Sequence, residues 1–317
     1  MIALEVGGTY IKGCALGPDG VPRDRERWFT RPERGPDAVL ESVLACAATL
    51  AERCRATAVG IVVPGTVDAG QAVYATALGW HGTPVRDWAA EHLDLPVAVG
   101  HDGRTGGLAE AREGAGRDCR DFLFVSMGDG IAASVVRNGL AVSEAQRGAD
   151  MLGHTPVRLG GDSCHCGGSG CLETVASAAA VARRYGRATG WRGISAREVY
   201  HRADAGDPAA LAVCGEAVDA LADVLATAVG RYAPERLVIG GEPAEAGAER
   251  LAPLGEALAG RLTGAAVPEL RPARFGDLTG CMGAALLARD LLGAGTGWWP
   301  GPDPHIERAE KIRAHRS

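Results

Sequence analysis

The sequence predicts an α/β fold made of two similarly built domains. Short apolar runs typical of strands alternate with longer segments that carry apolar residues at three- and four-residue intervals, as helices do. A strand, a glycine turn and a second strand occur twice, in "IALEVGGTYIKGCAL" and in "DFLFVSMGDGIAASVVRNG" from Asp121 to Gly139. This repeated hairpin is the main indication that one domain design is used twice.

The remaining elements follow from the same periodicities. Further strands are expected within 56–65, 95–100 and 235–241. Helices are expected at 36–53, 84–92, 104–115, 172–188, 208–232, 247–263 and 282–293. The predicted organisation is an N-terminal α/β domain (1–116), a C-terminal α/β domain (117–280), a last helix (281–295) returning to the N-terminal domain, and a charged tail (296–317) without an assigned function.

Composition excludes several classes of protein. The chain has 317 residues, of which 46% are hydrophobic and 23% charged, enough for two buried cores. A net charge of −6 argues against a nucleic-acid-binding surface. The sequence contains no run of about 18 apolar residues, which a membrane-spanning helix would need. The segment "MIALEVGGTY" lacks the basic start of a signal peptide. We therefore expect a cytoplasmic protein with mostly reduced cysteines.

One histidine and three cysteines cluster in "MLGHTPVRLGGDSCHCGGSGCLE", residues 151–173. Cys164, Cys166 and Cys171 are spaced C-x-C-x4-C, with His154 ten residues before the first cysteine. Three thiolates and one imidazole are a standard ligand set for structural Zn²⁺, and four protein ligands leave no open position for catalysis. The alternatives are a disulfide, which a reducing compartment disfavours, and a set of buried free thiols. The other cysteines lack such spacing and are expected in the core.

The two hairpin turns and one carboxylate are the candidate active-site features. Gly-Gly-Thr (7–9) and Gly-Asp-Gly (128–130) present backbone N–H groups, and two such loops facing each other would hold a polyphosphate; each is also compatible with a plain hairpin. Between them, the strand in "LPVAVGHDGR" delivers His101 and Asp102 to the start of a helix. Asp102 is placed as a general base in a cleft would be, although an N-cap of that helix explains it equally well.

Together these segments resemble the ROK family of bacterial sugar kinases, the glucokinase-like branch of the actin-like ATPase fold, over roughly residues 1–290. The most specific match is the zinc segment "GHTPVRLGGDSCHCGGSGCLE". "VGGTYIKGCAL", "VSMGDGIAASVV" and "VIGGEPAE" are similar to the family's nucleotide-side loops, and "ALGWHGTPV" and "LPVAVGHDGR" to the segments that line its sugar pocket. The resemblance implies two actin-like (ribonuclease-H-like) domains with a central cleft.

The resemblance also implies residue roles. Asp102 would be the general base, and Glu173 and His154 would bind sugar hydroxyls, with one His154 nitrogen on zinc and the other facing the pocket. His101 and Gly79 would also line the sugar site. The nucleotide and its phosphates would meet Glu5, Gly7, Gly8, Thr9, Lys12, Gly128, Asp129, Gly130, Gly240 and Gly241. The implied cofactors are structural Zn²⁺ and ATP with Mg²⁺, and the implied assembly is a homodimer or homotetramer. The chain starts at the first loop strand, so the DNA-binding segment of some family members is not expected.

Several positions depart from the family pattern. Glu5 replaces the usual aspartate of the first loop, Asp129 stands within the second loop, and Glu242 follows the third. On the sugar side, Ala77 and His101 replace asparagines and Met151 replaces a glutamate. Each lost hydrogen bond is worth roughly 0.5–1.5 kcal/mol. An amino sugar or cyclitol is therefore expected to fit better than glucose.

Asp129 allows three expectations. Two unit charges about 4 Å apart repel by roughly 4 kcal/mol at an effective dielectric near 20, so its carboxylate would weaken nucleotide binding. Mg²⁺ would reverse this by bridging the carboxylate to the phosphates, and an outward-turned side chain would do neither.

The motifs taken together allow three functions: a sugar or cyclitol kinase, a non-catalytic sugar-binding or regulatory protein on that scaffold, and an enzyme repurposed for proton transfer by Asp102 and His101.

Overall fold

The structure is a computed structural model that describes all residues except 18, 143–148, 150, 243–247, 265 and 294–317. The expected tail (296–317) and part of the loop after Gly241 therefore lie outside the described residues. None of the helices in the described part of the chain has the length and apolar character needed to cross a membrane.

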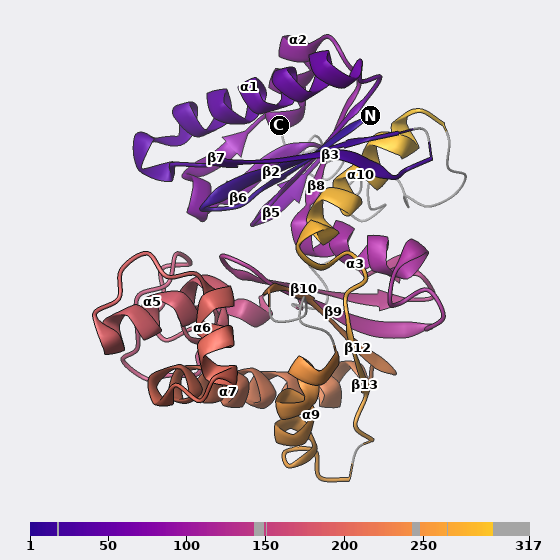
Figure 1. Ribbon diagram of the computed structural model, residues 1–317. Helices are drawn as coiled ribbons and strands as arrows, with labels where there is room; N and C mark the ends of the chain where they lie inside the picture. The colour runs from indigo at the N-terminus through magenta and orange to yellow at the C-terminus, as the bar shows by residue number, and fades with distance from the viewer. Residues whose placement is uncertain (18, 143–148, 150, 243–247, 265, 294–317) are drawn as a thin grey trace, which may run out of the picture.

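Two five-stranded sheets with the same arrangement form the two halves of the molecule (Figure 1). In spatial order the first sheet contains β3 (Pro22–Phe29), β2 (Tyr10–Leu16), β1 (Ile2–Val6), β4 (Val59–Val63) and β8 (Val97–His101). The second contains β11 (Leu140–Ala141), β10 (Ile131–Arg137), β9 (Asp121–Met127), β12 (Arg236–Gly241) and β13 (Glu269–Pro272). In each sheet the first three strands are antiparallel and the last two run parallel to the third. The α/β prediction is confirmed, and both expected hairpins are present as β1–β2 and β9–β10.

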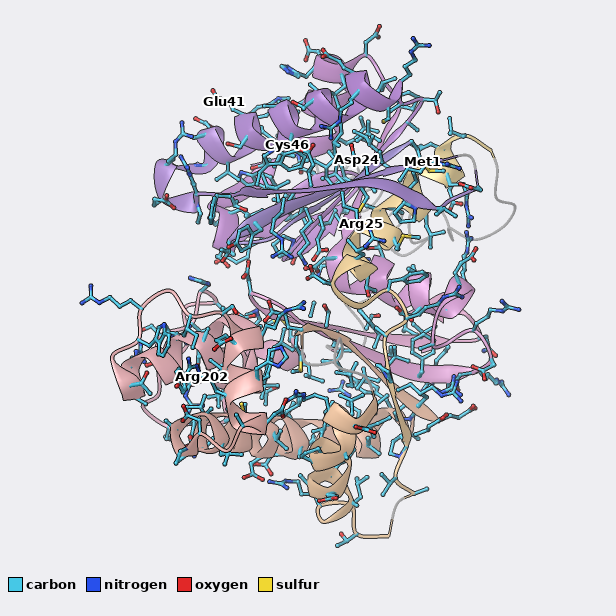
Figure 2. The ribbon with its side chains drawn as sticks, viewed as in Figure 1. Met1, Asp24, Arg25, Glu41, Cys46 and Arg202 are labelled. Carbon is cyan, nitrogen blue, oxygen red and sulfur yellow. The ribbon has the colours of Figure 1, made fainter. Side chains whose placement is uncertain are left out.

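Helices cover both faces of the first sheet. One face packs against α1 (Pro36–Cys54) and α2 (Val85–Leu93), and the other against α10 (Thr279–Leu291). Cys46 of α1 is buried against this sheet (Figure 2). A small sheet of β5 (Thr66–Asp68), β6 (Gln71–Ala75) and β7 (Trp80–Thr83), with η2 (Thr76–Leu78), extends this half. A side chain on Gly60 of β4 would collide with the Ala284 carbonyl of α10, so glycine allows the helix to lie directly on the strand.

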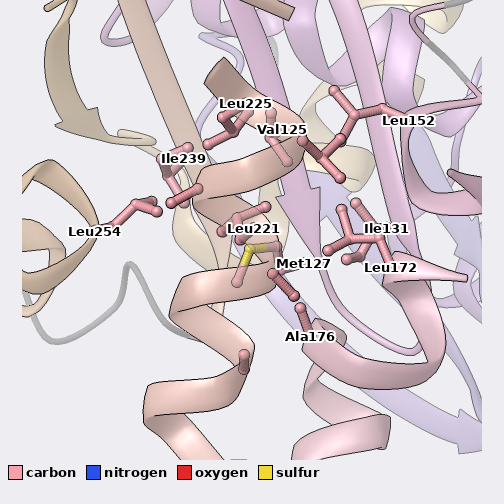
Figure 3. Close-up of a cluster of buried hydrophobic side chains, with 14 of the residues drawn as sticks. Val125, Met127, Ile131, Leu152, Leu172, Ala176, Leu221, Leu225, Ile239 and Leu254 are labelled. Carbon is pink, nitrogen blue, oxygen red and sulfur yellow. The ribbon is translucent and has the colours of Figure 1, made fainter. Parts of the chain in front are cut away.

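The second half is built around a larger helical layer. Its helices are α4 (Leu172–Ala176), α5 (Ala178–Thr189), α6 (Ala196–Asp204), α7 (Pro208–Tyr232) and α9 (Ala252–Ala259). Val125 of β9 and Ile239 of β12 pack against Leu221 and Leu225 of α7 and Leu254 of α9 (Figure 3). Short 3-10 turns are η1 (Pro32–Arg34), η4 (Leu152–His154), η5 (Ala248–Leu251) and η6 (Gly276–Leu278).

The structure differs from the sequence prediction in several elements. The single helix expected over 172–188 is broken at Ser177, where the backbone is extended (ψ 156°). A second helix begins there, and the Ser177 Oγ caps it by accepting the Ala180 N–H at 3.1 Å. The helix expected over 247–263 is shorter because η5 precedes α9. β3, the small sheet, α6 and β13 were not predicted. The expectation that Cys54 lies in the core is wrong, because this residue is exposed.

Helix α3 (Asp102–Glu113) lies between the two sheets (Figure 1). Glycines on α3 and α10 make this fit possible, because a side chain on Gly107 would collide with Ser134 of β10 and one on Gly283 would meet Thr105 of α3. The chain crosses between the halves after α3 and again before α10.

Both crossings are attached to the buried carboxylate of Glu110. Its Oε2 accepts the Ala115 N–H (2.7 Å) and the Arg274 N–H (3.0 Å), and its Oε1 accepts the Phe275 N–H (3.3 Å). Burial raises the pKa of Glu110, while these three amides act in the opposite direction. One side chain thus fixes both connections.

Candidate active site

The first loop is a tight hairpin turn, and its Thr9 amide faces the opposite half. The Gly7 N–H donates to the Tyr10 carbonyl (2.8 Å), which closes the turn. Thr30 supports it by donating its hydroxyl to the Gly7 carbonyl (2.7 Å) and its N–H to the Thr9 carbonyl (2.9 Å). The Thr9 N–H donates to Asp129 Oδ2 (2.7 Å), although the two residues are 120 positions apart. The two predicted loops are therefore in contact.

The second loop is held by Glu173. The Gly128 N–H donates to the Gly130 carbonyl (3.0 Å), and the Ile131 N–H donates to Glu173 Oε2 (3.0 Å). A side chain on Gly130 would collide with this carboxylate, so a larger residue there would force Glu173 to move. Glu173 lies in the first turn of α4, two residues after the last predicted metal ligand.

Asp102 begins α3 directly after β8. The helix is capped by His101, whose Nδ1 accepts the Arg104 N–H (3.2 Å), so the capping role that sequence assigned as an alternative to Asp102 belongs to its neighbour. With Nδ1 acting as an acceptor, the ring proton is on Nε2, which lies 3.5 Å from Asp102 Oδ1. The Asp102 side chain is 25% exposed whereas His101 is 5% exposed. Only the carboxylate is therefore open to a ligand.

The environment of Asp102 tunes its basicity. Burial raises the pKa of Asp102 to about 6; the Gly103 N–H at 2.6 Å, Lys12 and Arg104 act to lower it, and Glu173 raises it. A carboxylate with a pKa near 6 is still mostly ionised at pH 7 and is a stronger base than an ordinary aspartate.

A charged network lies behind the first loop. Lys12 Nζ donates to Asp277 Oδ1 (2.5 Å) and lies 3.5 Å from Glu5 Oε1, while Arg27 pairs with Asp277 Oδ2 (2.6 Å). Burial alone would lower the pKa of Lys12, but Glu5 and Asp277 raise it above its ordinary value. Lys12 is therefore engaged with carboxylates rather than directed to an open surface. Asp277 carried no sequence signal and was missed.

Glu5 is a candidate ligand for a cation. Burial raises its pKa, and its Oε2 is buried without a hydrogen-bond partner among the described residues. A buried carboxylate oxygen in that state needs a proton, a water or a cation. An oxygen of this kind suits Mg²⁺, which prefers hard oxygen ligands.

The four predicted metal ligands converge. The ligand atoms of His154, Cys164, Cys166 and Cys171 all lie within 4.8 Å of one another. His154 Nδ1 is 3.4 Å from Cys164 Sγ, and the Sγ atoms of Cys166 and Cys171 are 3.7 Å apart. A disulfide needs about 2.05 Å, whereas sulfurs bound at about 2.3 Å to a tetrahedral Zn²⁺ are about 3.8 Å apart. The donor set and spacing fit zinc.

The backbone of residues 154–171, named the zinc loop for the metal that its donor set fits, explains the convergence. Gly170 adopts a left-handed conformation (φ 64°), and a side chain there would collide with the Arg158 carbonyl. The Cys164 N–H donates to the Gly168 carbonyl (2.9 Å), and the Leu172 N–H donates to the Thr155 carbonyl (2.8 Å). The second bond joins the zinc loop to the start of α4, the helix that carries Glu173.

The remaining predicted positions surround these groups. Gly79 (φ 70°) ends η2, which carries Ala77, and a side chain on Gly8 would lie 3.8 Å from the Ala77 methyl group. Gly240 and Gly241 end β12 opposite Ser126 and Met127, so the third loop emerges beside the second. Met151 is 53% exposed.

Comparison with known proteins gives a consistent picture. The ROK family model matches residues 1–291. A glucokinase from Halalkalibacterium halodurans is 30% identical, over 91% of this chain and 94% of that protein. A kanosamine kinase from Amycolatopsis mediterranei is also 30% identical, over 93% and 97%. The DNA-binding regulator NagC from Escherichia coli is 30% identical over 60% of this chain and 49% of its own length.

A solved structure extends the similarity to the fold. The ROK family glucokinase from Streptomyces griseus, in complex with glucose and AMPPNP, superimposes with a TM-score of 0.82 at 26% identity. The match covers 92% of this chain and 99% of that one. The predicted two-domain actin-like architecture is thereby confirmed.

Proposed function

The chain belongs to the ROK family, and we propose that it transfers the γ-phosphoryl group of ATP to a hydroxyl group of a sugar or sugar-like molecule. In this proposal, residues 1–116 with the last helix form one domain and residues 117–280 form the other. The observation that carries it is the position of Asp102, a partly exposed carboxylate with a raised pKa, electrostatically coupled to both Lys12 of the first loop hairpin and Glu173 at the second loop.

The reaction needs a base at this position. The substrate hydroxyl oxygen attacks the γ-phosphorus while the bond from that phosphorus to the bridging oxygen of ADP breaks. The hydroxyl proton passes to Asp102, which His101 holds in place through the cap of α3. Phosphates are expected to bind the amides of the first and second loops, including Thr9 and Gly130, and the turn formed by Gly240 and Gly241 is expected to face the nucleotide. Mg²⁺ neutralises phosphate charge when bound with the nucleotide, and Glu5 is the residue that would hold it, directly or through water.

The proposed zinc site would support the side of the active site that binds the sugar. His154, Cys164, Cys166 and Cys171 would hold one Zn²⁺, which would connect η4 to the start of α4. With Nδ1 toward the thiols, His154 leaves Nε2 for a substrate hydroxyl. Glu173 uses one oxygen for the Ile131 amide and keeps accepting capacity for a second hydroxyl.

An amino sugar is the substrate class that the charges favour. Besides burial, which is the larger cause, Glu173 raises the pKa of Asp102, the direction in which repulsion between two carboxylates acts. A substrate ammonium group near them would relieve that repulsion. Ala77 and the exposed Met151 offer no polar side-chain atoms for additional hydroxyl groups. A cyclitol remains the second choice.

A regulatory function without catalysis is less well supported. The kinases named above match more than 90% of this chain, whereas NagC matches 60%. Proton-transfer chemistry by a His101–Asp102 pair is also disfavoured, because the His101 ring is buried and accepts the Arg104 amide.

The test is ADP release from ATP and Mg²⁺ across a panel of hexoses, amino sugars and cyclitols. We expect turnover with at least one amino sugar and its loss in Asp102→Asn. An absence of turnover throughout the panel, or equal turnover in Asp102→Asn, would refute the kinase proposal or the assigned base, respectively.

A further inference from the structure

A carboxylate of the second loop accepts a hydrogen bond from the first loop. Asp129 Oδ2 accepts the Thr9 N–H at 2.7 Å, and it also lies against Gly7, where a side chain would approach Asp129 Oδ2 to 3.2 Å. The residue therefore contacts the turn formed by residues 7–9 rather than pointing away from it. This contact was not among the three outcomes expected from sequence.

The Asp129 carboxylate lies where a phosphate oxygen would accept the same amide. Backbone N–H groups at a glycine turn are ordinary donors to phosphate oxygens, and a carboxylate oxygen accepts the same bond with the same sign of charge. Within the described residues, the nearby Lys12 is paired with Asp277 and Glu5 instead. Asp129 is exposed to solvent, so it can leave the loop without rearrangement of the core.

We propose that Asp129 determines which phosphate donors bind, because its carboxylate occupies the Thr9 amide until a phosphate group accompanied by a divalent cation displaces it. A metal-free polyphosphate must both break the Thr9–Asp129 bond and approach the displaced carboxylate. A donor carrying Mg²⁺ meets less repulsion, since the cation attracts the carboxylate. The proposal rests on the proposed phosphoryl transfer for its biological meaning, but the competition itself requires only the two loops.

Inorganic pyrophosphate is the sharpest probe, because it needs the loops and neither the sugar nor the base. We would measure its Kd by titration calorimetry at constant ionic strength, with EDTA and then with Mg²⁺, in the wild-type protein, Asp129→Asn and Asp129→Thr. The matched control is Asp94→Asn, which removes the same charge from an exposed residue at the end of α2.

The expected result is a gain of about tenfold or more in metal-free pyrophosphate affinity in both Asp129 variants, with no gain in Asp94→Asn. The ratio of the Kd values without and with Mg²⁺ should fall in the Asp129 variants. Hydrogen exchange of the Thr9 amide should also become faster in Asp129→Thr, because its acceptor is gone.

Equal pyrophosphate affinity and equal Mg²⁺ dependence in wild type and both Asp129 variants would overturn the proposal. Failure of all three proteins to bind pyrophosphate would overturn it too, because the loops would then not be an anion site. The kinase assay is separate: no turnover with any sugar, together with tighter pyrophosphate binding by the Asp129 variants, would refute phosphoryl transfer and still support the role of Asp129.

Discussion

The zinc loop and the first and second loops, for which we propose zinc and phosphate as ligands, are both built on glycine turns, but they would receive these ligands in opposite ways. The zinc loop brings its donors together around a space that a cation fits, with the Sγ atoms of Cys166 and Cys171 3.7 Å apart. In the first and second loops, the Asp129 carboxylate instead accepts the Thr9 amide that we propose for a phosphate oxygen. The proposed zinc site is a short local segment, whereas the proposed phosphate site combines residues 120 positions apart on different sheets. A ligand site within one short segment can be assembled by that segment alone. A site made by two segments depends on how the two halves of the molecule pack against each other.

Removal of zinc should have the largest effect. Structural Zn²⁺ contributes about 10–16 kcal/mol in small zinc-finger peptides, and a fraction of that would dominate the stability of a domain. We expect zinc at one ion per chain by elemental analysis, and loss of zinc with a lower Tm in Cys171→Ser. Cys54→Ser is the control because Cys54 is exposed and distant in sequence from the cluster. Identical melting of the two variants would show that the thiols bind no structural metal.

Loss of the base should have the next largest effect. Asp102→Asn keeps the size of the side chain but removes the proton acceptor, so kcat should fall by about 10²–10⁴-fold with little change in sugar affinity. In the wild-type protein, kcat/KM should fall about tenfold per pH unit below pH 6, because burial raises the pKa of Asp102 to about 6. A pH–rate profile that is flat down to pH 4.5 would move the base to another group.

The local origin of the zinc loop can be tested at two glycines with the same backbone conformation. Gly170 (φ 64°) lies against the Arg158 carbonyl, whereas Gly160 (φ 65°) has open space around it. Gly160→Ala should cost about 1 kcal/mol of unfolding free energy for the left-handed backbone alone, and Gly170→Ala clearly more because of the collision. Urea denaturation measures both. Equal losses would mean that the close approach at Gly170 does not shape the loop.

A gain in stability is predicted for a substitution of Asp102. The folded-state pKa of Asp102, about 6, lies above the ordinary value of 3.8. Ionisation of a group with a raised pKa destabilises the folded state, so the cost is absent below pH 3.8, grows as pH rises, and is complete above pH 6. Asp102→Asn should therefore be more stable than wild type by about 1–3 kcal/mol at pH 7. The gain should vanish near pH 4, and denaturation at the two pH values would reveal a pH-independent difference if the explanation is wrong.

The features that could be predicted from the sequence are those that depend on residues close together in the chain. Apolar periodicity located the two hairpins, and the spacing of Cys164, Cys166 and Cys171 identified a cluster that the structure does assemble. β3 was missed because this edge strand carries consecutive charged residues of alternating sign, Arg23 to Arg27, in place of an apolar run. The break at Ser177 was missed because helical periodicity continues across it.

Contacts between segments that are far apart in the chain could not be predicted from local sequence patterns. Lys12 and Asp277 are 265 positions apart, and a single aspartate before the last helix has no distinguishing context. The Thr9–Asp129 bond is of the same kind: the sequence marked Asp129 as unusual, but only the juxtaposition of the two turns shows which atom it meets.

The attachment of both crossing segments to Glu110 has a mechanical consequence. Since the two connections share one anchoring point, the simplest relative motion of the two sheets is a rotation about an axis through that point. Asp102 is eight residues away along α3, a lever arm of about 12 Å at 1.5 Å per residue. A turn of only about 10° then displaces groups at that radius by about 2 Å. A displacement of that size exceeds the range of hydrogen-bond lengths, so a small rotation about Glu110 would change the contacts that Asp102 makes.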